Sequence, residues 1–353
     1  MNYKSEKIIQ DIMNREDDLI DLTQALIRIP TLNPPGNNYL EICEFLKKRM
    51  ENNGFQSQLI RAYNTPGDSD KFPRWNLVCK REGGIQGKTV HFNGHTDVVE
   101  TGKGWSMNPF EAKYIDGLIY GRGACDMKGG IASSIIAVES FISLYPKYPG
   151  SIEFSFTADE ETGGYGGVAF LAKEGYFSPK KVNSVIIPEP LNKNRICLGH
   201  RGVWWAEIET FGRIAHGSMP FLGDSAIRHM GAVLNEFEEK LYPKLELIKT
   251  KMPVVPEGAK TSTMNINSIH GGEAEHPSEF NGYPAPVVAD SCKIIIDRRF
   301  LIEESIQTVK KDINDLLDDL QNSRENFKYK IKDLHEVIPT MTDQNSHLVN
   351  HLS

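Results

Sequence analysis

The chain has 353 residues, of which 39% are hydrophobic and 25% are charged, and its formal net charge is -7 at pH 7. This length is enough for two domains of ordinary size, and the composition is that of a globular protein. Because no block of basic residues stands out, we expect no nucleic-acid partner.

The cysteines and the N-terminal stretch indicate a compartment. The five cysteines are scattered, without a Cys-x-x-Cys pair. This argues against a disulfide framework and against a thiolate zinc site, and it favours a reducing environment. Residues 1–16 are charged and amphipathic without an apolar core of signal-peptide length, and no apolar run approaches a membrane span. We therefore expect a cytoplasmic protein with no membrane partner.

The N-terminal part of the chain predicts two helices and then three strands. Apolar residues recur at helical spacing throughout Ser5–Ile29, and the prolines and glycine of residues 30–38 end this helix. A second helix is expected at Tyr39–Asn52, where Asn53 and Gly54 stop it. The expected strands are Gln56–Arg61, Trp75–Lys80 and Lys88–Asn93.

The next part alternates helices with strands, and acidic residues follow the strands. Polar residues at successive strand ends describe an α/β sheet whose ligands lie beyond the carboxyl ends of the strands. The expected elements are the helix Ile131–Phe141, the strand Ser151–Ala158, the helix Gly167–Lys173 and the strand Ser184–Ile187.

A different pattern begins near His200. Strands and helices follow in the order β-α-β-β-α-β, the ferredoxin-like motif, so we predict a small domain over residues 200–334. Residues 1–199 with 335–353 would form the other domain. The expected elements are Val203–Phe211, Ser225–Lys240, Thr263–Ile269, Asp290–Phe300, Ile302–Leu320 and Asn326–Leu334, with Lys251–Lys260 and Gly271–Pro286 irregular.

A histidine and five acids stand at the strand ends and at one loop–helix junction. His95 and Asp97 lie two residues apart on a predicted strand, so their side chains share a face, and Asp97 could hold the second ring nitrogen of His95. Imidazole and carboxylate are ligands that zinc accepts. The other acids are Asp126 in a glycine-rich turn, Glu160 and Glu161 after one strand, and Glu189 between two prolines after another.

Each of these features also has an ordinary explanation. A His-x-Asp pair is usually a surface or capping feature, an acidic run is usually a solvated loop, and Glu between prolines is usually an exposed turn. The joint pattern is more specific, because three of the elements each follow a separate predicted strand. Two cations roughly 3.5–4 Å apart would provide hydroxide near neutral pH and polarise a carbonyl. Glu160 would then serve as general base.

The motifs together resemble the M20 family of metallopeptidases and amidohydrolases, in particular its acetylornithine deacetylase / succinyl-diaminopimelate desuccinylase branch. The resemblance implies a zinc-peptidase-like α/β catalytic domain with an inserted ferredoxin-like dimerisation domain. The motifs are GlyHisThrAspValVal (94–99), TyrGlyArgGlyAlaCysAspMetLysGlyGly (120–130), AspGluGluThrGlyGly (159–164), ProGluPro (188–190) and GlyArgIleAlaHisGlySerMetPro (212–220).

The resemblance also implies the roles of these residues. His95 and Glu189 would bind one Zn²⁺, Glu161 would bind a second, and Asp126 would bridge the two. Co²⁺ is an expected substitute. Asp97 would orient His95, Glu160 would be the base, and the peptide bond after Asp126 would be cis.

Four residues of the small domain are candidates for substrate contacts. His216 alone would be an ordinary residue preceding a helix. The resemblance implies that it crosses a dimer interface to stabilise the oxyanion in the partner's site. Arg299 alone would form a surface ion pair with Glu303 or Glu304, whereas the resemblance implies a bidentate clamp on the substrate carboxylate. Arg201 and Asn265 are further candidates of that kind.

Two departures from the family pattern bear on function. The family's last metal ligand is a histidine near the C-terminus, but His335, His347 and His351 lie outside the expected context. We expect the chain to be truncated or a fragment. Relatives often carry an Asn followed by a Pro ahead of the Asp290 strand, where this chain reads AlaProValValAlaAspSer.

Three functions remain open from the sequence. The first is a zinc-dependent hydrolase, a cytoplasmic homodimer of amino-acid biosynthesis, that removes the acyl group from a small N-acyl amino acid such as N-acetylornithine or N-succinyl-diaminopimelate. The second is a dipeptidase, carboxypeptidase or aminoacylase with the same centre. The third is a non-catalytic chain that dimerises but lacks a complete metal centre.

Overall fold

The computed structural model describes residues 3–191, 194–272 and 286–352. Its internal contacts define two compact units: unit 1 is Met1–Asn194, and unit 2 is Arg195–Ser353. Residues 335–353, which the sequence assigns to the catalytic domain, group with unit 2 in this division, and their domain membership stays a prediction. Most of the stretch 271–286, expected to be irregular, lies outside the described residues.

The N-terminal helix predicted for Ser5–Ile29 is two helices, α1 (Tyr3–Met13) and α2 (Glu16–Arg28), so the prediction of one helix was wrong. The chain breaks at Arg15, whose guanidinium turns inward to the carboxylate of Glu139, 2.5 Å away. The sequence does not reveal this break, because the helical spacing of apolar residues continues through it.

Unit 1 is built on a five-stranded sheet with the order β1-β2-β6-β3-β7. Strands β3, β6 and β7 run parallel, so their carboxyl ends meet at one edge. Strand β2 runs antiparallel to both of its neighbours, β1 and β6. The strands are β1 (Gln56–Arg61), β2 (Trp75–Glu82), β3 (Gly84–His95), β6 (Tyr148–Thr157) and β7 (Ser184–Ile186).

Several further elements connect these strands. A short hairpin, not predicted, turns at Asp116 and Gly117, which both have positive φ, as a two-residue Asp-Gly turn favours. The hairpin strands are β4 (Lys113–Ile115) and β5 (Leu118–Tyr120), and the helices are α3 (Tyr39–Asn52), α4 (Lys128–Leu144), the 3₁₀ turn η1 (Glu160–Thr162) and α5 (Val168–Lys173).

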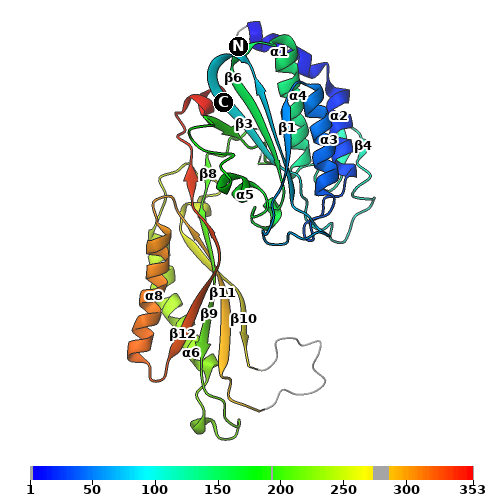
Figure 1. Cartoon of the computed structure of the whole chain (residues 1–353). Coiled ribbons are helices and arrows are strands. Elements are labelled where there is room, and N and C mark those ends of the chain that lie inside the picture. Colours follow the sequence, from blue (N-terminus) through cyan, green and yellow to red (C-terminus); the bar gives the residue numbers. More distant parts are fainter. Residues whose placement is uncertain (1–2, 192–193, 273–285, 353) are drawn as a thin grey trace. The chain divides into compact units, whose positions relative to one another are not determined.

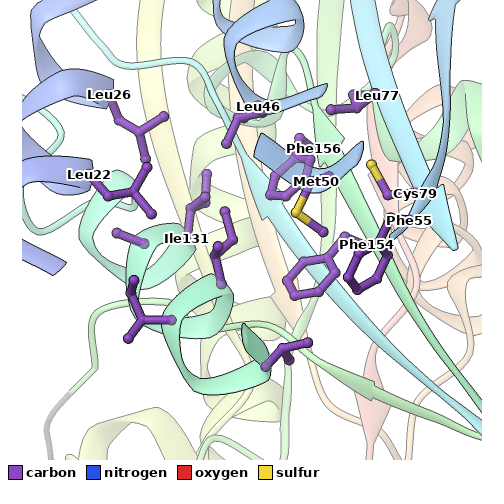
Figure 2. Packing of buried hydrophobic residues seen from close by; sticks show 14 of the residues in the cluster. Leu22, Leu26, Leu46, Met50, Phe55, Leu77, Cys79, Ile131, Phe154 and Phe156 are labelled. Atoms are coloured by element: carbon purple, nitrogen blue, oxygen red, sulfur yellow. The ribbon is translucent and has the colours of Figure 1, made fainter. Parts of the chain in front are cut away.

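The core of unit 1 lies between the sheet and helices α2, α3 and α4, which stand together beside it (Figure 1). Figure 2 shows Leu26 of α2, Leu46 of α3 and Ile131 of α4 gathered near Phe154 and Phe156 of β6. These side chains are at most 2% exposed. Burying aliphatic and aromatic groups stabilises the unit and fixes the strand ends that carry the polar residues.

Unit 2 has the predicted β-α-β-β-α-β order, with an antiparallel sheet arranged β10-β11-β9-β12. Helices α6 and α8 contribute to one apolar core with this sheet. Its elements are β9 (Gly202–Phe211), α6 (Ala226–Glu236), β10 (Thr263–Gly271), β11 (Ser291–Phe300), α8 (Ile306–Ser323) and β12 (Lys328–Val337).

Two helix boundaries in unit 2 differ from the prediction. The helix expected to end at Lys240 continues through a π-turn, Phe237–Leu241, into α7 (Tyr242–Leu247), because Pro243 lies in the first turn of α7, where proline is tolerated. The helix expected from Ile302 starts at Ile306, because Ser305 caps it. The remaining elements are β8 (Gly199–His200), η2 (Pro220–Leu222), η4 (Glu257–Lys260), β13 (Thr340–Met341) and α9 (His347–Leu352).

Candidate metal centre

The carboxyl ends of the three parallel strands place the predicted ligands at one edge of the sheet of unit 1. His95 is the last residue of β3, η1 with Glu160 and Glu161 follows β6, and Glu189 follows β7. Asp126 comes from the turn just before α4. Side chains separated widely in the chain therefore come together as the alternation of strands and helices predicts.

The Nε2 atom of the His95 imidazole faces three of the acids. It lies 3.0 Å from Asp126 Oδ1, 3.5 Å from Glu189 Oε1 and 3.8 Å from Glu160 Oε2. The His95 side chain is 1% exposed, while those of Asp126 and Glu160 are 54% and 55% exposed. A buried imidazole thus points outward into a ring of accessible carboxylates.

The four predicted ligands and the predicted base, Glu160, form two overlapping groups that share His95. In each group, one donor atom per residue lies within 4.8 Å of the others: His95 with Glu160 and Glu189, and His95 with Asp126 and Glu161. One imidazole nitrogen with several carboxylate oxygens is a donor set suited to zinc and to other divalent metals. The arrangement therefore fits a metal centre built from all four predicted ligands.

The other ring nitrogen of His95 is held from behind by Asp97. His95 Nδ1 lies 3.0 Å from the main-chain oxygen of Asp97 and 3.4 Å from its Oδ1. Two acceptors at Nδ1 favour the tautomer that carries its proton there, which leaves the lone pair of Nε2 for a cation. The side chain of Asp97 thus lies where the sequence placed it, although the shorter contact is to its main chain.

The carboxylate of Asp97 also holds the turn that carries the acids. The main-chain N–H groups of Glu160 and Glu161 donate to Asp97 Oδ1 and Oδ2, both at 3.2 Å. The side-chain amide of Asn33 donates to Oδ2 at 2.9 Å. Asn33 was not among the predicted site residues. Its only signal in the sequence is a polar residue within the proline-rich segment after α2.

The first acid of the AspGluGlu run has a structural place. Asp159 has a φ of 62°, and its side chain turns inward, where the hydroxyl of Tyr39 donates to Oδ1 at 3.0 Å and Nε of Arg74 donates to Oδ2 at 3.1 Å. Because Asp159 is anchored in this way, the turn can present Glu160 and Glu161 at the surface.

The electrostatics of the centre favour a bound cation. Burial and the nearby charge of Asp126 raise the pKa of Glu161 to about 7. Burial, with the charges of Asp126 and Glu160, likewise raises the pKa of Glu189 to about 7, although His95 opposes the shift. Burial also raises the pKa of Glu160. Crowded carboxylates resist ionisation together, and a divalent cation among them relieves that cost.

The same surroundings also raise the pKa of His95, because the nearby acids stabilise its charged form. Burial alone would lower the pKa of His95, but the hydrogen bond and charge of Asp97, with the charges of Glu160 and Glu189, raise it to about 10.

The peptide bond between Asp126 and Met127 is cis, as the resemblance implies.

A second constellation in unit 1 resembles a Ser-His-Glu triad. His91 Nε2 lies 2.8 Å from Ser155 Oγ, and His91 Nδ1 lies 3.2 Å from Glu153 Oε2. Ser155 is 0% exposed, and its hydroxyl also accepts from the amide of Asn93 at 2.8 Å. A substrate carbonyl has no access to this hydroxyl, so the trio stabilises the polar face of the sheet and is no site for acyl transfer.

The predicted substrate contacts belong to unit 2. Arg299 donates to Asp297 from Nε at 2.7 Å and from a terminal nitrogen at 3.0 Å. The alternative in which Arg299 pairs with Glu303 or Glu304 is therefore wrong: Arg298, not Arg299, pairs with Glu304. The reason is that residues 297 and 299 lie two apart on β11, so their side chains share a face.

The other three unit 2 candidates have local partners. Arg201 donates to the carbonyl of Thr261 at 3.3 Å and to the hydroxyl of Thr263 at 3.2 Å. Asn265 donates to Asn267 at 2.7 Å. His216 is exposed, and its Nδ1 lies 2.8 Å from the hydroxyl of Ser218.

Neither of the two donor groups described above includes His335, His347 or His351. His347 and His351 stack on α9 with ring centroids 4.1 Å apart, and His335 packs against Trp205. All five cysteines are free. Within residues 3–191, 194–272 and 286–352, no helix has the length and apolarity needed to cross a membrane.

The chain is similar to several known proteins. The chain is 28% identical over 309 residues, 85% of its length, to a succinyl-diaminopimelate desuccinylase from Polynucleobacter necessarius subsp. necessarius (strain STIR1), of which it covers 73%. It shares its fold with human carnosine dipeptidase 1, with a TM-score of 0.68, 18% identity, and coverage of 98% of this chain and 83% of that one.

A third similar protein is the Bacillus subtilis YXEP protein, described as a dinuclear metal-binding peptidase. The TM-score is 0.59 at 14% identity, covering 93% of this chain and 76% of the other. A family model described as peptidase family M20/M25/M40 matches residues 91–353, which include every predicted metal ligand. On these grounds the chain belongs to peptidase family M20/M25/M40.

Proposed function

We propose that this protein is a zinc-dependent amidohydrolase that cleaves the amide bond of an N-acyl amino acid, of the acetylornithine deacetylase or succinyl-diaminopimelate desuccinylase type. The observation that carries the proposal is the two-sided contact of His95. Asp97 holds Nδ1, while Nε2 faces Asp126, Glu160 and Glu189. The relative that is 28% identical supports the desuccinylase type.

In the proposal, His95, Asp126, Glu161 and Glu189 hold two Zn²⁺ ions per subunit, with Co²⁺ as a substitute. When bound, such a pair supplies Lewis-acid chemistry, which polarises the amide carbonyl and lowers the pKa of water. The protein's contribution is to hold donors from separate strand ends in one place. Asp97 fixes the tautomer of His95, and its carboxylate fixes the turn by accepting from the main-chain N–H groups of Glu160 and Glu161.

Glu160 is the proposed general base. Its carboxylate is 55% exposed and lies beside the His95 nitrogen, so it can reach a water molecule at the centre. Burial raises its pKa, which makes it a better proton acceptor than an ordinary glutamate near neutral pH. The same carboxyl would then return the proton to the departing amine.

Unit 2 supplies the remaining proposed roles. We infer that it is the dimerisation domain of a homodimer, that His216 of one subunit donates to the oxyanion in the partner's site, and that Arg299, Arg201 and Asn265 bind the substrate carboxylate. Burial and the nearby charge of Arg299 lower the pKa of Arg201.

Two other functions compete with this proposal. The same centre would serve a dipeptidase, carboxypeptidase or aminoacylase, and the fold shared with human carnosine dipeptidase 1 favours the dipeptidase among these. A chain that dimerises without a complete metal centre would bind fewer than two ions. Comparing the hydrolysis rates of dipeptides with those of N-acetylornithine and N-succinyl-diaminopimelate separates a peptidase from the proposed deacylase. Measuring zinc per chain by elemental analysis tests whether the metal centre is complete.

The direct test is Glu160→Gln in the zinc-loaded protein. We expect turnover of the N-acyl amino acids to be abolished while the zinc content stays at that of the wild type, because the change removes the base and keeps the fold of the turn. If the zinc-loaded wild type hydrolysed none of the N-acyl amino acids, this would contradict the proposed function. Full activity of Glu160→Gln would contradict the role of Glu160.

A further inference from the structure

We propose that Asn33 is a positioning residue of the metal centre, which fixes the carboxylate of Asp97 and, through it, the imidazole of His95 and the turn that carries the acids. This inference rests on the proposed function of that centre.

Asn33 bridges two parts of the site with one amide group. Its Nδ2 donates to Asp97 Oδ2 and to the hydroxyl of Thr162, each at 2.9 Å, and the residue is 1% exposed. Rotating the amide by half a turn would bring its oxygen against the carboxylate oxygen of Asp97. Only the orientation with the nitrogen toward Asp97 is therefore stable.

The main chain around Asn33 is locked to the strand end that it serves. Leu32 forms a parallel β-bridge with Val98. The N–H of Asn33 donates to the carbonyl of Val98 at 2.9 Å, and the N–H of Val98 donates to the carbonyl of Thr31 at 3.0 Å. The hydroxyl of Thr31 donates to the carbonyl of Thr96 at 2.5 Å. These bonds fix the main chain of Asn33 beside that of Asp97, so the amide of Asn33 stays within reach of the carboxylate.

Among the described residues, the side chain that donates a hydrogen bond to Oδ2 of Asp97 is the amide of Asn33. The other donor to that oxygen is the N–H of Glu161, at the longer distance of 3.2 Å. Asp97 is 0% exposed, so no bulk water replaces a lost donor. Without the amide, the carboxylate can rotate, and both the contact with His95 Nδ1 and the support of the acidic turn weaken. Partners behind a ligating histidine typically account for about 10–100-fold in metal affinity.

A matched amide exists away from the centre. Asn53 donates from Nδ2 to Glu139 Oε1 at 2.9 Å and to the carbonyl of Arg49 at 3.0 Å, so it also joins a carboxylate and one further oxygen. It lies just after α3, in a cluster with no predicted metal ligand. Asn53→Ala therefore removes the same kind of bonds without changing the site.

The experiment measures Zn²⁺ affinity of the full chain, stripped of metal, by competition with a chromophoric chelator at pH 8. We expect Asn33→Ala to weaken Zn²⁺ binding by about 10–100-fold. Asn33→Asp keeps the shape of the side chain but replaces the donor with an acceptor, so it should weaken binding at least as much. Asn53→Ala should bind Zn²⁺ as the wild type does, whatever its melting temperature.

A double-mutant cycle identifies the route of the effect. If Asn33 acts through Asp97, then Asn33→Ala added to Asp97→Ala should cause little further loss of Zn²⁺ affinity. Wild-type affinity in a folded Asn33→Asp variant, or an equal loss in the Asp97→Ala background, would overturn the inference. These outcomes do not depend on turnover, so a protein that binds Zn²⁺ but hydrolyses no substrate tests the proposed function separately.

Discussion

Gly130 on α4 packs directly against the carbonyl of Pro188: a Cβ at residue 130 would lie 2.1 Å from that oxygen. Pro188 precedes Glu189, one of the predicted metal ligands. The helix that begins just after Asp126 therefore abuts the segment that carries Glu189, and the contact leaves no room for a side chain.

From this contact we predict that Gly130→Ala displaces Glu189. We expect Zn²⁺ affinity to fall by roughly tenfold or more, and the free energy of unfolding to fall by about 1–3 kcal/mol from overpacking. The control is Gly231→Ala on α6, where an added Cβ meets nothing within 4 Å. Alanine at an open helical position should raise stability by about 0.5–1 kcal/mol. Unchanged Zn²⁺ affinity in Gly130→Ala would contradict this prediction, because it would mean that α4 shifts and Glu189 keeps its place.

A second prediction concerns Glu139, the buried acid that joins α4 to the N-terminal helices. Its side chain is 5% exposed and accepts from Arg15 at 2.5 Å and from Arg49 at 2.8 Å and 2.9 Å. Glu139→Ala leaves two partly buried guanidinium groups with Asp18 as their remaining acid. We expect a loss of about 3 kcal/mol, measured by urea unfolding.

Lys47→Ala is the control for this change, because its pair with Glu51 is an exposed i,i+4 pair on α3. It should cost less than about 0.5 kcal/mol. Equal losses for the two variants would mean that the Glu139 cluster contributes no more than a surface ion pair.

The third prediction is a pH dependence of stability at Glu153. Burial alone would raise its pKa, but hydrogen bonds from His91 and Lys80 outweigh burial, and the pKa is lowered from 4.5. A lowered folded-state pKa gives stability that is present above the unfolded value and is lost as pH falls through the folded value. Glu153→Gln should therefore lower the melting temperature at pH 7, by an equivalent of roughly 1–3 kcal/mol, and the difference should shrink below about pH 4.

Melting curves from pH 3 to pH 8 measure this difference. Glu82→Gln is the control, since Glu82 pairs with the same Lys80 at 3.1 Å but is 69% exposed. That variant should melt like the wild type across the range. A constant difference for Glu153→Gln at all pH values would point to packing as the cause.

The fourth prediction concerns removal of metal. A ligand that binds only the folded state stabilises it by about 2.7 kcal/mol at a hundred times its dissociation constant. Adding excess chelator to the zinc-loaded wild type should therefore lower the melting temperature, and returning Zn²⁺ should restore it. His95→Ala, which lacks the nitrogen shared by both ligand groups, should show a much smaller response. A chelator effect of the same size in that variant would place the stabilising ion elsewhere.

The sequence predicted the fold well wherever local pattern and topology agree. Strand ends followed by polar residues located His95, Asp97 and the AspGluGlu run, because parallel strands deliver their carboxyl ends to one edge. The order of elements after His200 predicted the ferredoxin-like unit, because strands and helices in that order form one antiparallel sheet that packs with two helices. The roles of the individual ligands came from resemblance, and they remain predictions for this chain.

The features that were missed depend on contacts between distant residues. The break at Arg15 is fixed by Glu139, 124 positions away, and nothing in the local spacing marks it. The contact of Asn33 with Asp97 spans 64 positions and arises only when the segment after α2 pairs beside Val98. The ion-pair alternative for Arg299 named Glu303 or Glu304 because the sequence has acids on both sides of it, and the alternation of β11 selects Asp297 instead.

The turn from Glu160 to Thr162 is tied to Asp97 by its own amide hydrogens. The identity of the side chains at 160 and 161 does not enter those bonds. It follows that the predicted ligand Glu161 can be replaced by another ligating residue, such as aspartate or histidine, while both bonds to Asp97 remain. An engineer seeking altered metal preference would start at position 161 and leave Glu160 and Asp97 untouched.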